Sequence, residues 1–215
     1  ARRIAVAKGE VPADLVLRNA RLVNVLSGEI HPADILVDSG LVIGLHGGLA
    51  RASLDLGGRH VVPGLIDSHI HIESTLLCPR EFARAAAPRG TAAVVCDPHE
   101  IANVLGGAGI EYMLAASEGS PLTFYFMMPS CVPATHLETS GAALTAEDVR
   151  RFLDAYPERI LGLAEMMNFP GVLFRDPEVL AKLLAAGERP IDGHAPLVSG
   201  RDLDAYVLAG PGSDH

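Results

Sequence analysis

The sequence predicts an α/β fold: an incomplete (β/α)8 TIM-type barrel preceded by a small β-sandwich module. Residues 13–62 contain short alternating runs separated by turn residues, a pattern typical of β-strands. After residue 62, apolar runs alternate with amphipathic segments, as in the βαβ units of a parallel sheet. Polar residues follow each apolar run directly, where such barrels carry their active-site residues. We therefore expect a β module over residues 1–62 and the first five to six barrel units over residues 63–215.

The composition is that of a globular protein, and its charge excludes some classes of binding partner. The chain has 215 residues, of which 49% are hydrophobic, and a net charge of −9. This charge argues against nucleic acid or an anionic membrane as the main partner. No apolar run reaches the roughly 18 residues of a membrane span. Three cysteines are too few for a disulfide framework, so we expect reduced thiols and a cytoplasmic protein.

The β module is expected to hold two strand segments followed by a hairpin. The hairpin turn is assigned to the three residues Asp38-Ser39-Gly40, where Gly40 can adopt a positive φ. The strands should pair antiparallel as half of a sandwich. The segments are residues 14–19, 21–26, 33–37 and 41–45.

The barrel part is expected to contain five strands and five helices in alternation. Thr145 and Ser199 are typical helix N-caps followed by acidic residues, and Gly187 is a typical C-terminal glycine. The strands are residues 61–66, 91–96, 122–128, 160–164 and 190–193, and the helices are residues 79–87, 108–117, 145–155, 176–186 and 199–209.

Side chains that can bind metals or substrates occur at the end of every predicted strand. A doubly wound sheet also binds ligands at strand ends, but mainly at one switch point, so the pattern favours a barrel. No G-x-G-x-x-G or P-loop motif is present. In strand order, the residues are Asp67, His69 and His71; Asp97, His99 and Glu100; Ser130 and Cys131; Glu165; His194; and His215.

His69-Ile70-His71 is the most specific of these patterns. In a strand, residues i and i+2 point to the same side, so both imidazoles face one space and can chelate a divalent metal ion. The alternative is a hydrogen-bonded histidine pair with no chemical role.

The surrounding motifs resemble a known family. Pro-Gly-Leu-Ile-Asp-Ser-His-Ile-His over residues 63–71 is similar to the first-strand motif of the amidohydrolase superfamily. Further segments resemble, in order, the adenine deaminases of bacteria and archaea within that superfamily. These segments are residues 96–104, 129–134, 163–168, 192–196 and 212–215.

The resemblance implies a site with two divalent transition-metal ions. His69 and His71 would bind the first ion, Glu165 would bridge both ions and take part in catalysis, and His194 and His215 would complete the second site. Histidine and carboxylate ligands suit Mn, Fe or Zn better than Ca or Mg, and Mn is expected.

Other roles remain open for several residues. Glu165 is also compatible with a structural ion pair, and His194 with a simple turn histidine. Asp97, His99 and Glu100 are candidates for substrate binding, for an additional metal ion, or for capping the helix that follows. Cys131 is a candidate substrate contact or a core residue.

The activity that the resemblance implies is hydrolytic deamination of adenine to hypoxanthine and ammonia by a metal-activated hydroxide. The expected partners are adenine and water, and the intact protein is expected to be a homo-oligomer. An alternative is another cyclic amidohydrolase, similar to dihydroorotases or hydantoinases. Those enzymes usually carry a lysine where this chain has Glu165. A third possibility is a non-catalytic protein that retains the fold.

The length is short for the predicted fold. Only 153 residues follow position 62, whereas a complete barrel needs about 200–250. We therefore expect the N-terminal part of a longer enzyme, lacking the family's proton-transferring aspartate after strand eight and unstable or inactive alone.

Overall fold

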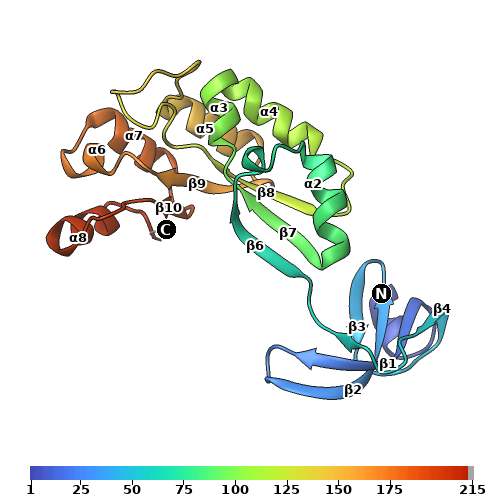
Figure 1. Ribbon diagram of the computed structural model, residues 1–215. Helices are drawn as coiled ribbons and strands as arrows, with labels where there is room; N and C mark the ends of the chain where they lie inside the picture. The colour runs from blue at the N-terminus through green and yellow to red at the C-terminus, as the bar shows by residue number, and fades with distance from the viewer. Residues whose placement is uncertain (213–215) are drawn as a thin grey trace. The chain divides into compact units, whose positions relative to one another are not determined.

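The structure is a computed structural model that describes residues 1–212; His215 lies outside the described residues. The chain divides into two compact units, Ala1–Pro63 and Gly64–His215, and each is described by itself (Figure 1). The sequence placed the boundary one residue earlier, after position 62.

The first unit is a five-stranded sheet with one short helix. Its strands run in the order β3-β2-β1-β4, and β5 also pairs with β1. The elements are α1 (Arg2–Ala7), β1 (Ala13–Asn24), β2 (Glu29–Asp38), β3 (Leu41–Gly44), β4 (Ala50–Asp55) and β5 (His60–Val61).

Two expectations for this sheet are corrected. The segments 14–19 and 21–26 form one strand, β1, whose register shifts between Leu17 and Ala20 beside Asn19, at φ 55°. The sheet is mixed rather than antiparallel. β2 runs antiparallel to β1, but β4 and β5 run parallel to it, because the chain after β3 crosses to the other edge of β1.

The β2–β3 hairpin is tighter than expected. Asp38 pairs with Leu41, so the loop has two residues, Ser39 and Gly40, rather than three. Both have positive φ angles, 51° and 74°, as in the type I′ turn that matches the twist of paired strands. The Asp14 carboxylate accepts a hydrogen bond from the Ser39 amide, which ties the turn to β1.

The second unit is a parallel sheet with helices between its strands. The strands are β6 (Leu65–Ile70), β7 (Thr91–Cys96), β8 (Thr123–Met128), β9 (Ile160–Met166) and β10 (Ile191–Gly193). The α-helices are α2 (Pro79–Ala86), α3 (His99–Leu105), α4 (Gly107–Ala116), α5 (Ala146–Ala155), α6 (Phe169–Leu173), α7 (Pro177–Ala185) and α8 (Gly200–Leu208). The 3-10 helices are η1 (Glu73–Thr75) and η2 (Ala87–Arg89).

The strand order identifies this sheet as part of a barrel. The five strands lie side by side in chain order, β6 to β10, and every neighbouring pair is parallel. Helices α2 to α5 cover one face of the sheet (Figure 1). A doubly wound sheet would reverse its strand order and carry helices on both faces. The predicted incomplete (β/α)8 barrel is therefore confirmed.

The first barrel strand begins later than expected. It runs from Leu65 to Ile70 rather than over residues 61–66, so Asp67 and His69 lie within it. Pro63 has no amide hydrogen to donate to a sheet. Gly64 packs against β7 so closely that a Cβ on it would lie 2.3 Å from the Cβ of Ala92. The other four strands begin within one residue of their expected positions, and β9 continues two residues further, to Met166.

The helices follow the expected pattern with three additions. Each of the five expected helices is present within one residue at either end, whereas α1, α3 and α6 were not expected. Thr145 and Asp148 form a capping box at α5, but the Ser199 side chain makes no capping hydrogen bond at α8. None of the helices within residues 1–212 is long and apolar enough to cross a membrane.

Candidate metal centre

Four parallel strands bring histidines and carboxylates together at their carboxyl ends. His69 belongs to β6 and His71 follows it, Asp97 and His99 follow β7, Glu165 belongs to β9, and His194 follows β10. Neighbouring parallel strands end at the same edge of a sheet, so side chains distant in sequence converge there.

His69 and His71 face each other, as their i, i+2 spacing predicts. Their Nε2 atoms lie 3.1 Å apart, and their ring planes are at 81°. The Nδ1 atom of His71 lies 3.0 Å from the carbonyl oxygen of Asp97. That oxygen can only accept, so Nδ1 carries a hydrogen, and Nε2 is the ring nitrogen that faces the group.

Glu165 lies among three imidazoles. Its carboxylate is almost fully buried, with 5% of the residue exposed. One oxygen, Oε1, is 3.1 Å from Nδ1 of His194 and 3.5 Å from Nε2 of His69, and the other, Oε2, is 3.6 Å from Nε2 of His71. The structure thus brings together four of the five residues to which the sequence assigned metal binding.

Asp97 and His99 form a hydrogen-bonded pair beside this group. The Nδ1 atom of His99 lies 3.0 Å from Oδ2 of Asp97. Burial by itself lowers the pKa of His99, but the hydrogen bond and charge of Asp97 outweigh it, so the pKa is raised. The other Asp97 oxygen, Oδ1, is buried and has no hydrogen-bond partner within residues 1–212.

The donor atoms are close enough to share an ion. His71, Asp97, His99 and Glu165 each present one ligand atom, and these atoms lie within 4.8 Å of one another. The lone pair of His71 Nε2 faces the Glu165 carboxylate and a second imidazole nitrogen. A lone pair and a carboxylate that face one shared point can both coordinate a cation placed there. The geometry of the group therefore fits a bound cation.

Two further candidates from the sequence lie apart from the group. The Glu100 carboxylate accepts a hydrogen bond from the Ser74 hydroxyl. Cys131 is in the hydrophobic core, where its sulfur accepts a hydrogen bond from the Asn168 amide, and burial raises the pKa of its thiol. Its sulfur also lies 3.6 Å from the sulfur of Met166, another core residue.

Glu73 and Tyr206 each hydrogen-bond a backbone amide at or close to a histidine of the group, and the sequence indicates only Glu73. Glu73 accepts a hydrogen bond from the Ile101 amide at the start of α3, and its other oxygen is buried without a partner in the described chain. Its position two residues after His71 is the available signal. Tyr206 of α8 reaches the ends of β9 and β10 by its hydroxyl, and no sequence motif marks it.

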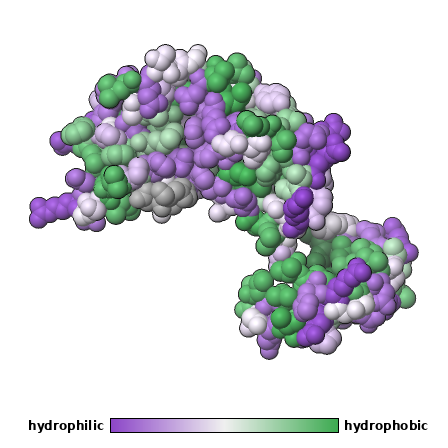
Figure 2. Space-filling model, viewed as in Figure 1, coloured by the Kyte–Doolittle hydropathy of each residue, from purple (hydrophilic) through white to green (hydrophobic). Residues whose placement is uncertain are grey.

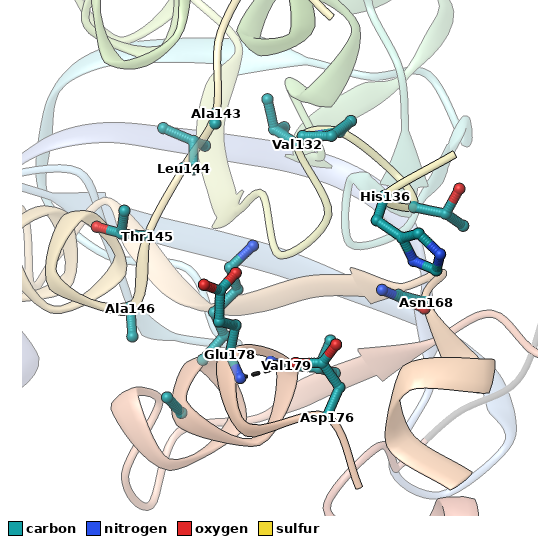
Figure 3. Close-up of a pocket in the computed structure, with 14 residues that line it drawn as sticks. Val132, His136, Ala143, Leu144, Thr145, Ala146, Asn168, Asp176, Glu178 and Val179 are labelled. Carbon is teal, nitrogen blue, oxygen red and sulfur yellow. Dashed lines mark hydrogen bonds between the residues drawn. The ribbon is translucent and has the colours of Figure 1, made fainter. Parts of the chain in front are cut away.

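A separate cavity of about 380 Å³ lies between the loop that follows β8 and helix α7 (Figure 3). His136 and Asn168 line one side, and Glu178 projects from α7 on another. Lys182 also lines it, and burial lowers the pKa of its amine. None of the histidines and carboxylates of the metal-binding group contributes to this cavity.

Comparison with known proteins identifies a family for most of the chain. The model of the amidohydrolase family matches residues 60–215. That range contains every residue of the candidate metal centre.

Curated relatives match almost the whole chain. An adenine deaminase of Oleidesulfovibrio alaskensis is 66% identical over 212 residues, which are 99% of this chain and 37% of the relative. Adenine deaminases of Syntrophobacter fumaroxidans and Methanothrix thermoacetophila are 58% and 53% identical, covering 100% and 99% of this chain. This chain spans 37% of the length of each of these relatives.

Two solved structures share the fold at low sequence identity. An N-acyl-D-glutamate deacylase from Bordetella bronchiseptica, complexed with zinc and a phosphonate inhibitor, superposes with a TM-score of 0.55 at 17% identity. The superposition covers 93% of this chain and 48% of the deacylase. A dihydroorotase superposes with a TM-score of 0.54 at 15% identity, covering 89% of this chain and 54% of that structure.

Proposed function

Because this chain belongs to the amidohydrolase family, we propose that the group around Glu165 is the metal centre of a hydrolase. The observation that carries the proposal is the arrangement of His69, His71 and His194 around a buried carboxylate. The carbonyl partner of His71 Nδ1 supports it, since metal-binding histidines commonly donate their second ring hydrogen in this way.

The proposed centre holds two ions. His69 and His71 would hold the first ion, Glu165 would be shared by both ions, and His194 and His215 would hold the second. A set of imidazole nitrogens and carboxylate oxygens suits Mn, Fe or Zn, and we propose Mn²⁺. Asp97 and His99 are proposed to bind substrate or an additional ion, which would also give the buried Oδ1 of Asp97 a partner.

The proposed reaction of the complete protein is hydrolysis of adenine to hypoxanthine and ammonia. The names and identities of the curated relatives support this substrate. Water adds to the ring carbon that carries the amino group, the bond from that carbon to nitrogen breaks, and ammonia leaves. Bound divalent ions supply a Lewis acid that lowers the pKa of water, so that hydroxide is present near neutral pH.

The residues of this chain have distinct parts in that reaction. Glu165 orients His69 and His194 through one carboxylate oxygen and would be the carboxylate that both ions share. Asp97 fixes the ring of His99 through Nδ1, so that the other nitrogen, Nε2, is the one that can meet the substrate. The group that delivers a proton to the leaving nitrogen is proposed to lie after the eighth barrel strand, outside this chain.

The test is a substrate screen of the complete protein with Mn²⁺. Adenine, hydantoin and dihydroorotate are supplied separately, and ammonia release and ring opening are measured. We expect ammonia from adenine alone. Ring opening of hydantoin or dihydroorotate without turnover of adenine would contradict the proposal.

Glu165→Gln gives the first specific prediction. The amide keeps the size of the side chain but cannot supply two anionic oxygens to two ions. We expect the bound metal to fall below two ions per chain and adenine turnover to fall by at least about a hundredfold, since catalytic ligands typically contribute several kcal/mol. Metal content by elemental analysis and ammonia release check this. The matched control is Glu188→Gln at an exposed position, which should retain both ions and full turnover.

A further inference from the structure

Two strand ends at the metal centre are held by buried side-chain hydroxyls in addition to the sheet, in which β9 still pairs with β10 at Met166 and Gly193. The pairing of β8 with β9 ends at Met128 and Leu163, before the chain reaches Glu165. The carbonyl oxygens of Glu165 and Met166 both accept hydrogen bonds from hydroxyl groups. These groups belong to Ser130 and Tyr206, which are 1% and 0% exposed.

Tyr206 links the strands that carry Glu165 and His194. Its hydroxyl donates to the carbonyl oxygen of Met166, the residue after Glu165, at 2.8 Å. The same hydroxyl accepts a hydrogen bond from the backbone amide of His194, also at 2.8 Å. One oxygen atom therefore spans the ends of β9 and β10, next to the 3.1 Å contact between Glu165 Oε1 and His194 Nδ1.

Ser130 holds the other side of Glu165. Its hydroxyl lies 2.5 Å from the carbonyl oxygen of Glu165, and it reaches that oxygen from the end of β8. The backbone around Glu165 is thus hydrogen-bonded from the loop after β8 on one side and from helix α8 on the other. Since side-chain χ angles occupy discrete rotamers, a fixed backbone at Glu165 also fixes the place that its carboxylate can reach.

We propose that Tyr206 and Ser130 are positioning residues of the metal centre, and that Tyr206 sets the separation between Glu165 and His194. This inference rests on the proposed function, because it assumes that Glu165 is shared by two ions and that His194 serves the second. It assigns different effects to the two hydroxyls. Loss of the Ser130 hydroxyl weakens the binding of both ions through Glu165. Loss of the Tyr206 hydroxyl weakens mainly the binding of the ion that His194 would hold.

The test is a metal titration of Tyr206→Phe in the complete protein. The phenyl ring still fills the core, and a single oxygen is removed. The metal-free protein is titrated with Mn²⁺ and with Co²⁺ against a competing chelator, and the two dissociation constants and the visible spectrum of the Co²⁺ form are recorded. Tyr112→Phe is the matched control, because it removes a hydroxyl from a half-exposed tyrosine on the outer helix α4.

We expect Tyr206→Phe to raise the dissociation constant of the second ion by about tenfold or more, as for other groups that orient metal ligands. The dissociation constant of the first ion should stay nearly unchanged. The Co²⁺ spectrum should change with the second constant, and Tyr112→Phe should match the wild type. A purely structural role would lower the unfolding temperature of the metal-free protein and leave both constants unchanged. That result would overturn the proposal.

Ser130→Ala provides an independent second variant if Tyr206→Phe does not fold. We expect Ser130→Ala to raise the dissociation constants of both ions by similar factors. A folded Ser130→Ala protein with wild-type constants would contradict the proposal. Failure of the proposed function itself looks different, because the wild-type protein would then bind fewer than two transition-metal ions before any substitution is made.

Discussion

At the scale of single residues, a hydrogen bond decides what His71 can do. The carbonyl oxygen of Asp97 accepts a hydrogen bond from Nδ1 of His71. The other ring nitrogen, Nε2, therefore directs its lone pair at His69 and Glu165. The same side chain on an exposed strand would exchange tautomers freely in water. The chemical meaning of the His-x-His motif at residues 69–71 therefore depends on the backbone of the neighbouring strand.

The second prediction concerns Lys182, which lines the cavity beside α7. Burial lowers the pKa of its amine in the folded protein. An unfolded chain keeps this proton up to a pKa of about 10.4, so folding releases a proton at pH values between the two pKa values. The free energy of unfolding of the wild type consequently rises with pH between the folded and unfolded pKa values of Lys182. Below the folded pKa, the full cost of burying the charged amine is present.

We expect Lys182→Met to raise the free energy of unfolding at neutral pH, because methionine fills similar space without a charge. The gain should shrink as the pH rises toward about 10. Denaturant unfolding of both proteins at several pH values measures the difference. Lys8→Met, at an exposed lysine paired with Glu10, should show no such trend. A gain for Lys182→Met that is independent of pH would refute the assignment to charge burial.

At the scale of secondary-structure elements, capping side chains mark the starts of α5, α6 and α7. Thr145 and Asp148 hydrogen-bond each other's backbone amides at the start of α5, and Asp176 caps α7 through the amides of Glu178 and Val179. Such contacts lie within four residues and can be predicted from the order of residues alone. The start of β6 could not be predicted in this way, because the contact between Gly64 and Ala92 joins separate strands.

The third prediction concerns the N-terminus of α5. Thr145→Ala removes the hydroxyl that accepts from the Asp148 amide and should lower the free energy of unfolding by about 1 kcal/mol. Ser199→Ala at α8 is the control, since the Ser199 side chain makes no capping hydrogen bond. We expect its effect to stay within about 0.5 kcal/mol. Equal losses from the two substitutions in denaturant unfolding would contradict this account of the cap.

At the scale of the whole molecule, the first unit presents an apolar sheet face. A groove of about 410 Å³ lies against this face, which includes parts of β1, β2, β3 and β5. Apolar side chains gather on the visible surface of this unit (Figure 2). Leu26 is 96% exposed, Val25 63% and Val42 62%. Exposed apolar patches of this kind usually mark a contact surface. We propose that the rest of the complete protein covers this face as the second layer of a composite β-sandwich.

The fourth prediction follows from that face. The isolated chain of residues 1–215 should bind a hydrophobic fluorescent dye strongly, self-associate and show no adenine turnover, because the barrel sheet also has unpaired edges at β6 and β10 in the described chain. The complete protein should bind the dye weakly. A monomeric, active chain of residues 1–215 with little dye binding would contradict the proposed sandwich and the expected incompleteness.

The sequence by itself determined the fold class, four of the five barrel strands and the residues that gather at their ends. Hydrophobic periodicity, cap residues and the His-x-His spacing all act over a few residues, so one chain displays them. Only the tertiary structure decided that β1 is one strand in a mixed sheet, that Cys131 faces the core, and that Asp97 fixes the tautomer of His71. It alone placed Tyr206 across two strand ends. The hydrogen bonds of His71 and Tyr206 join residues 12 to 40 positions apart, which no local pattern encodes.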